Sequence, residues 1–322
     1  MERDERYDFY KAILMFGVVW GHAITNFGGG GISCNITWFL RLYDMPFFML
    51  VSGYFLRFSI VKYNTCKQLE NKLTTILIPS MIWSLILSLG KSPLGYYFLL
   101  AIFLSSVTII LVERLFKEKL RWLIYLLIIL LLYTTSIKSF NLCYLFPFFL
   151  LGYKSELWHK NIKAISFVIF LIGICFWNSS YTIWNSKTNI LLGYNVAIID
   201  LFRIVIGFVG VVTMKMVFDM IYTYFFTNHN RILSYFANTV GRETLGIYIL
   251  QHIIVFRGLK YFTSFLIDKI GYNPFLWNDR FLIYVITPLF SLLVLFVSYW
   301  FISTCKSNKY MKYLWGFKIS TL

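Results

Sequence analysis

The chain has 322 residues, of which 59% are hydrophobic and 20% aromatic, and its formal net charge is +16. Soluble domains are roughly 45–50% apolar, and no polar stretch is long enough to hold one, so we expect a single membrane-embedded domain over residues 1–322. The basic residues form short clusters between apolar runs rather than one patch with interleaved aromatics. This pattern excludes nucleic acid as the expected partner and indicates a lipid bilayer.

Ten apolar runs of roughly 18–25 residues, the length that crosses a bilayer, follow one another along the chain. They predict an all-α integral membrane protein built as a bundle of about ten transmembrane helices. The runs lie near residues 9–27, 37–57, 73–90, 94–112, 121–137, 141–157, 163–179, 196–222, 240–257 and 281–303. The charged start Met1–Asp8 has no cleavage site before the first run, which we therefore expect to be retained as a helix.

The distribution of Lys and Arg predicts the orientation of this bundle. With the N-terminus in the cytoplasm, 21 of the 30 basic residues fall in inside segments and seven in outside segments. Inside segments of membrane proteins are enriched in Lys and Arg, so both termini are predicted to be cytoplasmic. The five cysteines show no CxxC spacing, so we expect neither a metal site nor a disulfide framework.

Ionisable residues inside membrane spans are costly and suggest functional sites. Lys11 and His22 are eleven positions apart, which places them on one face of a helix about 16 Å apart along its axis. A cation at one end and a titratable base at the other suit a long anionic donor. The spacing leaves a second interpretation equally open. In it, Lys11 only extends to the membrane surface and His22 only hydrogen-bonds a neighbouring helix.

Two further pairs of charged residues fall within predicted spans. Arg41 lies three positions before Asp44, and Asp200 lies three positions before Arg203, so each pair can form an ion pair along a helix. Unpaired charges in a membrane would be expensive. Structural pairing is therefore the favoured interpretation of both pairs from the physics alone.

Five segments resemble the acyltransferase-3 family of membrane O-acyltransferases, in the order in which that family carries them. They are Lys11–His22, Asp44–Phe55, Lys72–Trp83, Phe146–Tyr153 and Gly241–Tyr248. The first is similar to the family's hallmark of a basic residue, ten intervening residues and a His. The resemblance covers residues from about 5 to 260.

The chain departs from the family pattern at two places. Many members have Arg where this chain has Lys11. Many also have His three residues after the tyrosine of the last segment, where this chain has Gln251. His252 is one step further, about 100° around the helix, so the resemblance assigns it no role.

The resemblance implies an enzyme of the bacterial inner membrane that moves an acyl group, commonly acetyl from cytosolic acetyl-CoA, to a hydroxyl. Glycans and lipid-linked glycans are the typical acceptors. We expect His22 to be the catalytic base or a transient acyl carrier. Asp44 would orient the imidazole or the acceptor, and Arg41 would steady developing negative charge.

The donor site is expected to use basic residues on the cytoplasmic side. Lys11 would bind the CoA phosphates, with help from Lys72 and Arg242. Ser52 would line the path or donate a hydrogen bond to the thioester oxygen. The alternative is that Ser52-Gly53 only permits close helix packing.

Two other classes of function fit the same composition. A transporter or flippase for a glycan or lipid-linked intermediate would also use buried charges and many helices. A structural membrane subunit is the third class, which the intramembrane charges disfavour. No sequence feature predicts an oligomeric state.

Overall fold

The computed structural model describes residues 4–27, 35–87, 97–134, 141–154, 160–177, 194–227, 231–258 and 282–306, with a few single positions at 261, 268–269, 308, 311 and 315. Over these residues the backbone forms helices joined by turns, and no strand occurs among them. The predicted all-α class is confirmed for this part of the chain.

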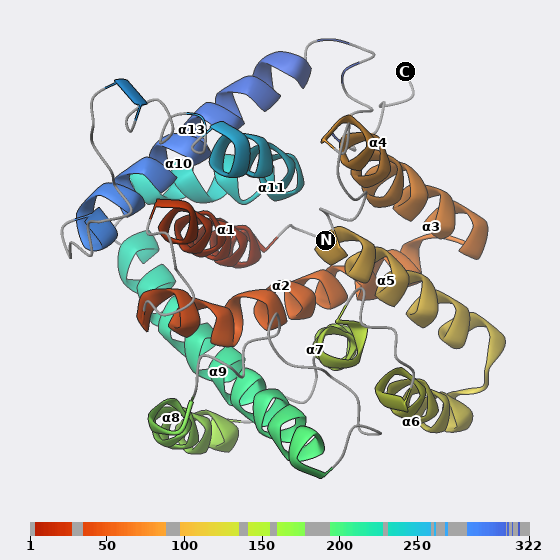
Figure 1. Ribbon diagram of the computed structural model, residues 1–322. Coiled ribbons are helices and arrows are strands. Elements are labelled where there is room, and N and C mark those ends of the chain that lie inside the picture. The colour runs from red at the N-terminus through yellow and green to blue at the C-terminus, as the bar shows by residue number, and fades with distance from the viewer. Residues whose placement is uncertain are drawn as a thin grey trace. The chain divides into compact units, whose positions relative to one another are not determined.

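The described residues form α-helices (Figure 1) and short π-helical turns, which are given the label η here. In chain order they are α1 (Glu5–Phe27), α2 (Asn35–Lys62), α3 (Thr65–Lys72), η1 (Leu73–Leu77), α4 (Ile78–Leu87), α5 (Tyr97–Leu115), α6 (Glu118–Thr134), α7 (Leu142–Tyr153), α8 (Lys160–Cys175), α9 (Tyr194–Thr227), α10 (Arg231–Val240), α11 (Thr244–Gln251), η6 (His252–Gly258), η9 (Leu282–Ile286) and α13 (Thr287–Lys306). Each of the ten predicted runs overlaps at least one of these helices, whereas α3 lies between two runs and α10 ends at the first residue of the run 240–257.

Four of the described helices are long and apolar enough to cross a membrane, which indicates a membrane protein. They are Ile36–Lys62, Tyr97–Leu115, Ile198–Phe225 and Ile283–Lys306. Three shorter apolar helices cover Leu142–Tyr153, Ala164–Cys175 and Thr244–Phe256. The count of ten spans and the cytoplasmic position of both ends stay predictions.

The helix within the predicted run 141–157 is shorter than a membrane span. α7 has 12 residues, about 18 Å at ~1.5 Å per residue, against a hydrocarbon core of about 30 Å. Asn141 precedes it in a left-handed conformation, with φ of 48°. All its residues except Pro147 and Leu151 are buried, so the described helix is surrounded by protein.

Contacts between residues divide the chain into two compact units. Unit 1 comprises Met1–Asp44 and Val217–Leu322, and unit 2 comprises Met45–Met216. α2 and α9 each begin in one unit and end in the other. The division of α2 falls between Asp44 and Met45, one residue before Pro46, which removes a helical hydrogen bond and favours a kink.

In unit 2, α2 crosses α7 with backbone against backbone. A Cβ atom added at Gly53 would lie 2.0 Å from the carbonyl oxygen of Phe149, and one at Gly152 would lie 1.9 Å from that of Leu50. Small residues permit such close approach of helices. The packing alternative raised for Ser52-Gly53 is therefore confirmed for Gly53.

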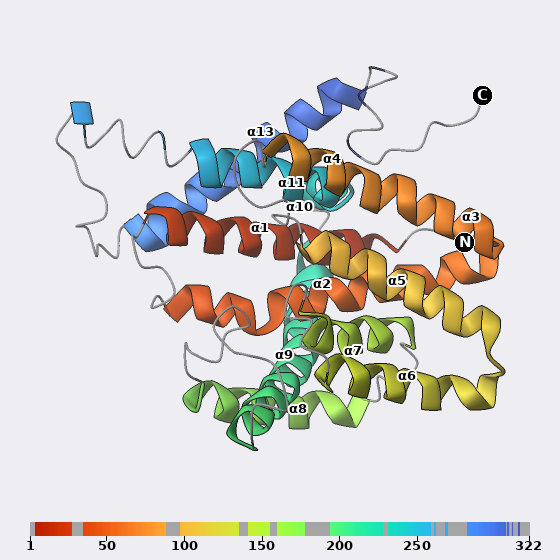
Figure 2. The same ribbon diagram turned by 45° about the vertical axis from the view of Figure 1, so that its right-hand side comes forward.

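α5, α6 and α7 lie side by side in unit 2 (Figure 2), and the side chain of Glu113 on α5, which is 7% exposed, joins α6 and the residue that follows α7. Its carboxylate accepts from Arg121 at 2.7 Å, from Lys154 at 3.1 Å and from the Tyr125 hydroxyl at 2.8 Å. Several donors around one carboxylate offset the cost of burying its charge.

The C-terminal end of α2 is capped by side chains from α3 and α5. The buried amide of Gln68 donates to the carbonyl groups of Ser59, Ile60 and Tyr63 at 3.1, 3.2 and 2.6 Å. Arg114 donates to the carbonyl groups of Ile60 and Tyr63, each at 2.8 Å. These bonds satisfy carbonyl groups that have no partner within the helix, and the cation complements the helix dipole.

The predicted pair of Asp200 and Arg203 is confirmed on α9 in unit 2. The two side chains meet at 2.8 Å and are 4% and 2% exposed. The guanidinium also lies over the ring of Tyr144 on α7, 5.0 Å from its centroid. Burial makes the pairing necessary, because either charge alone would be strongly destabilising.

In unit 1, α1 lies against α10, α11 and α13, as Figures 1 and 2 show. Near its C-terminal end, the indole N–H of Trp20 donates to the Thr287 hydroxyl at 2.9 Å. At the other end of α13, Lys306 forms an ion pair with the buried Glu243, which directly precedes α11. α13 therefore runs antiparallel to both α1 and α11.

The substitution Gly53→Ala is expected to lower the thermal unfolding midpoint of the detergent-purified protein. The added methyl group would force α2 and α7 apart, and overpacking of this kind costs about 1–3 kcal/mol, or roughly 3–10 °C in a chain of this size. The control is Gly258→Ala, where the nearest atom to the new Cβ is 3.9 Å away. Equal midpoints for the two variants would contradict the crossing.

Candidate functional site

Lys11 and His22 lie on one unbroken helix. α1 runs from Glu5 to Phe27, so the two residues are about 16 Å apart along the axis and about 20° apart around it. The shared face that the spacing predicts is therefore present. Its two ends have different surroundings, both built by unit 1.

The N-terminal end of α1 carries a basic cluster, which consists of Asp8, Lys11 and Arg242. The Asp8 carboxylate has no exposed surface, and it accepts from the Lys11 ammonium at 2.7 Å. Arg242 Nε lies 3.9 Å from its second oxygen, and Arg242 also donates to Asn238 at 2.9 Å. Lys11 is 16% exposed and Arg242 47% exposed, so Arg242 is the more accessible of the two cations.

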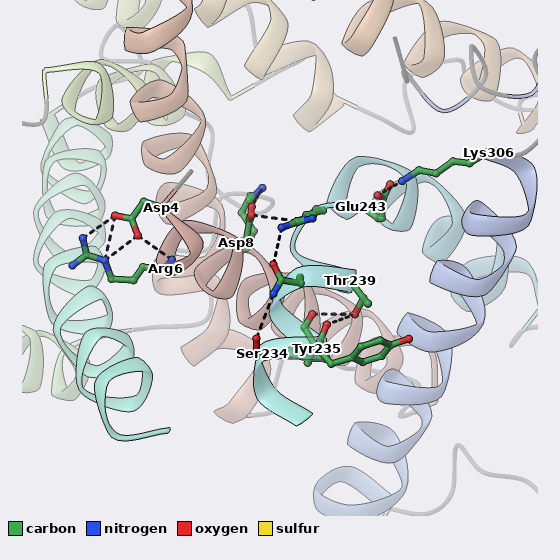
Figure 3. A network of polar contacts seen from close by, with 12 residues as sticks. Asp4, Arg6, Asp8, Ser234, Tyr235, Thr239, Glu243 and Lys306 are labelled. Carbon is green, nitrogen blue, oxygen red and sulfur yellow. Dashed lines mark hydrogen bonds and ion pairs between the residues drawn. The ribbon is translucent and has the colours of Figure 1, made fainter. Parts of the chain in front are cut away.

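A glycine brings Arg242 to this position. A Cβ atom added at Gly241 would lie 2.0 Å from the backbone oxygen of Asp8, so only glycine lets the turn after α10 approach α1 this closely. Figure 3 shows Asp8, Glu243 and Lys306 following one another across this end of the unit. The same end is also joined to α9, because the Tyr10 hydroxyl donates to Asp219.

At the C-terminal end of α1, His22 meets the end of α11. Its Nδ1 atom lies 2.9 Å from Oε1 of Gln251, a side chain with no exposed surface. The His22 ring is 5.6 Å from the His252 ring and 4.8 Å from the Phe256 ring, centroid to centroid. Gln251, where the chain departs from the family pattern, thus lies beside His22, and so does the next residue, His252.

The first turns of α2 pack onto the glycine face of α1. Added Cβ atoms at Gly17 and Gly21 would lie 3.3 and 4.0 Å from the methyl groups of Leu40. The next residue, Arg41, lies in the same turn of α2 as Leu40.

Asp44 lies one turn after Arg41 on α2 and is 5% exposed. It belongs to unit 1, as do Lys11, His22, Arg41 and Arg242. The proposed pairing of Arg41 with Asp44 stays a prediction.

The remaining predicted site residues, Ser52 and Lys72, belong to unit 2. Ser52 precedes the packing contact at Gly53, and Lys72 ends α3. Lys67 on the same helix is paired with Glu70 at 3.0 Å. The roles predicted for Ser52 and Lys72 remain predictions.

The two ends of α1 also give the direction of α11. Asp8 meets Gly241 and Arg242 before α11 begins, and His22 meets Gln251 where α11 ends. α1 and α11 are therefore parallel, and α13 is antiparallel to both. These relative directions are those of the predicted runs 9–27, 240–257 and 281–303.

Sequence reasoning missed Asp8 and gave Gln251 no role. The signal for Asp8 was its spacing of three residues from Lys11, which allows an ion pair on a helix. No sequence signal marks Gln251, because its contact with His22 joins residues 229 positions apart. Within the described ranges, no group of three or more His, Cys, Asp or Glu side chains is arranged to hold a metal ion.

The substitution Asp8→Asn is expected to destabilise the protein by roughly 1–3 kcal/mol, measured as a loss in the midpoint of thermal or denaturant unfolding. Removing one partner of a buried ion pair costs about 3–5 kcal/mol, and the exposure of Arg242 to solvent reduces that figure. Asp4→Asn is the control, because it breaks a pair with Arg6 at 2.8 Å in which the two side chains are 29% and 54% exposed. It should cost less than about 1 kcal/mol, and a similar loss in both variants would count against a buried role for Asp8.

Among known proteins, the chain is 27% identical over 148 residues to the nodulation protein NolL of Sinorhizobium fredii. The match covers 44% of this chain and 38% of the length of that relative. No family model matches the chain, and no solved structure matches it. Membership of the acyltransferase-3 family therefore stays a prediction.

Proposed function

We propose that the chain is a membrane O-acyltransferase. It would move an acyl group, most simply acetyl, from cytosolic acyl-CoA to a hydroxyl of a cell-surface glycan or glycan precursor. The observation that carries this proposal is the layout of α1, which bears the basic cluster at one end and the hydrogen-bonded His22 at the other. A donor that is anionic at one end and reactive at the other matches this layout.

Two coarser findings support the proposal. The distant similarity to a nodulation protein fits an acyl- or acetyltransferase role. The four helices that are long and apolar enough to cross a membrane fit an enzyme that works in one. We further propose that the protein is a multi-pass protein of the bacterial inner membrane, with the basic cluster toward the cytosol, as the distribution of Lys and Arg predicts.

In the proposed donor site, Lys11 and Arg242 bind the phosphates of CoA. Charge-assisted hydrogen bonds to phosphate are among the strongest that side chains make. Asp8 fixes the two cations in place and leaves Arg242 about half exposed. Lys72 is proposed to assist on the same side of the membrane, and that part of the proposal rests on the resemblance alone.

In the proposed reaction, His22 acts on the acceptor hydroxyl. Its ring takes the hydroxyl proton while the hydroxyl oxygen attacks the carbonyl carbon of the thioester. The new C–O bond forms, the C–S bond breaks, and the departing CoA thiolate takes the proton back from the imidazolium. The products are the acyl ester and free CoA, with His22 neutral again.

Three further residues have supporting parts in the proposal. Arg41, which follows Leu40 where α2 packs on α1, would stabilise the negative charge that develops on the carbonyl oxygen. Asp44 would orient the acceptor or the imidazole. Ser52 would line the path of the donor, a part that rests on the resemblance.

The substitution His22→Ala is expected to slow single-turnover CoA release from acetyl-CoA by about 10²–10⁴-fold, the usual contribution of a general base. The measurement uses detergent-purified protein with and without candidate glycans, and the unfolding midpoint of the variant confirms that it is folded. If His22 instead carries the acyl group, mass spectrometry without acceptor will show an acylated wild-type protein.

Undiminished CoA release from folded His22→Ala protein would overturn the role of His22. If wild-type protein released no CoA with several donors and acceptors, and moved a glycan across vesicles without donor, the transporter alternative would replace the proposal.

The substitution Arg242→Gln is expected to raise the KM for acetyl-CoA about 10-fold, because it removes a charged hydrogen bond worth about 1.5–3 kcal/mol. The KM for acetyl-pantetheine, which has no phosphate, should not change. Arg6→Gln is the matched control, since Arg6 lies near the same end of α1 and is paired with Asp4. An equal rise for both donors would argue against a phosphate site at Arg242.

A further inference from the structure

We infer that Gln251 is part of the catalytic machinery, with one end of its amide on His22 and the other on the donor. Its oxygen holds His22 in the tautomer that leaves Nε2 free, and its nitrogen donates a hydrogen bond to the acyl carbonyl oxygen. This inference rests on the proposed function and deepens it by adding a residue.

The oxygen of Gln251 determines which ring nitrogen of His22 carries the proton. Oε1 lies 2.9 Å from Nδ1, and an amide oxygen can only accept, so Nδ1 must donate. A neutral imidazole with its proton on Nδ1 has its lone pair on Nε2. Nε2 is then the atom that takes the proton of the acceptor hydroxyl.

The position of His22 is fixed by its backbone as well as by its ring. Asn26, one turn later on α1, donates from its side chain to the His22 carbonyl oxygen at 2.8 Å. The ring of Phe256 lies against His22 edge to face, and it stacks on His252 with 4.8 Å between centroids. The imidazole is thus held by a hydrogen bond to Gln251 and by aromatic contacts with Phe256 and His252.

The nitrogen of Gln251 is the second observation that points to a ligand. The residue has no exposed surface, and its Nε2 atom has no hydrogen-bond partner among the described residues. Leaving a buried polar group without a partner is unfavourable, and such groups in native proteins call for an explanation. A substrate atom that accepts a hydrogen bond supplies the missing partner.

The chemistry of the step selects the acyl carbonyl oxygen as that partner. The amide nitrogen offers only N–H donors, and the carbonyl oxygen is the substrate atom on which negative charge grows during attack. A donor placed at such an atom is worth about 10²–10³-fold in rate. Gln251 would then act together with Arg41, which is proposed above to stabilise the same negative charge.

The first test reads the tautomer and needs no substrate. Histidine labelled with ¹⁵N is examined by solid-state NMR in bilayers, and His22 is assigned among the four histidines by its loss in His22→Gln. We expect wild-type His22 to carry its proton on Nδ1, and Gln251→Leu to lose that preference. A proton on Nε2 of His22 in the wild type would mean that the Gln251 amide faces the other way. That result overturns the claim that the Gln251 oxygen selects the His22 tautomer.

The second test measures the hydrogen bond that the Gln251 nitrogen is proposed to donate to the acyl carbonyl oxygen. Acetyl-CoA labelled with ¹³C at the carbonyl is bound to His22→Ala protein, which holds it unreacted, and its C=O stretch is measured by isotope-edited infrared spectroscopy. The stretch should move to higher frequency when Gln251→Leu is added, because the bond that polarises the carbonyl is lost. An unchanged C=O stretch overturns the proposed hydrogen bond from the Gln251 nitrogen to the acyl carbonyl oxygen.

The kinetic test compares Gln251→Leu with Thr287→Val, which removes the hydroxyl that binds Trp20 near the same end of α1. Gln251→Leu should lower kcat about 10²–10³-fold with KM for acetyl-CoA changed less than about 3-fold, and Thr287→Val should keep wild-type kcat. Wild-type kcat in folded Gln251→Leu protein overturns the inference. If wild-type protein releases no CoA at all, the hydrogen bond from Gln251 to the acyl carbonyl is overturned together with the proposed function. The tautomer measurement still decides whether Gln251 orients His22.

Discussion

The arrangement of unit 1 depends on how the charge of Asp8 is neutralised. Its carboxylate has no exposed surface, so it must be paired within the protein. Lys11 on its own helix supplies one cation, and Arg242 supplies a second from a turn that reaches α1 only because residue 241 is glycine. A single buried carboxylate thereby fixes where α11 begins relative to α1.

Once the start of α11 is fixed relative to α1, helix geometry determines the rest of the contact between these two helices. α11 runs parallel to α1 and ends at His22, so the position of Gln251 beside the imidazole follows from an ion pair at the far end of the helix. α13 is tied at both of its ends, to Trp20 through Thr287 and to Glu243 through Lys306. Polar contacts at the helix ends thus align three helices whose middles are apolar.

The sequence was sufficient for features that depend on spacing along one element. Run lengths predicted the helices, helical periodicity predicted the shared face of Lys11 and His22, and spacing of three predicted the pair of Asp200 and Arg203. Contacts between elements could not be predicted in this way. Neither the contact of Arg242 with Asp8 nor that of Gln251 with His22 has a signature in local sequence, because each joins residues more than 200 positions apart.

The choice of an amide at position 251 makes physical sense for a histidine that must accept a proton. A carboxylate in the same place would also accept from Nδ1, but its charge would favour the imidazolium, which has no lone pair to offer. An apolar side chain would leave both tautomers available. A neutral amide selects the tautomer without adding charge to a low-dielectric site, and its nitrogen, which has no partner among the described residues, stays available to a substrate oxygen.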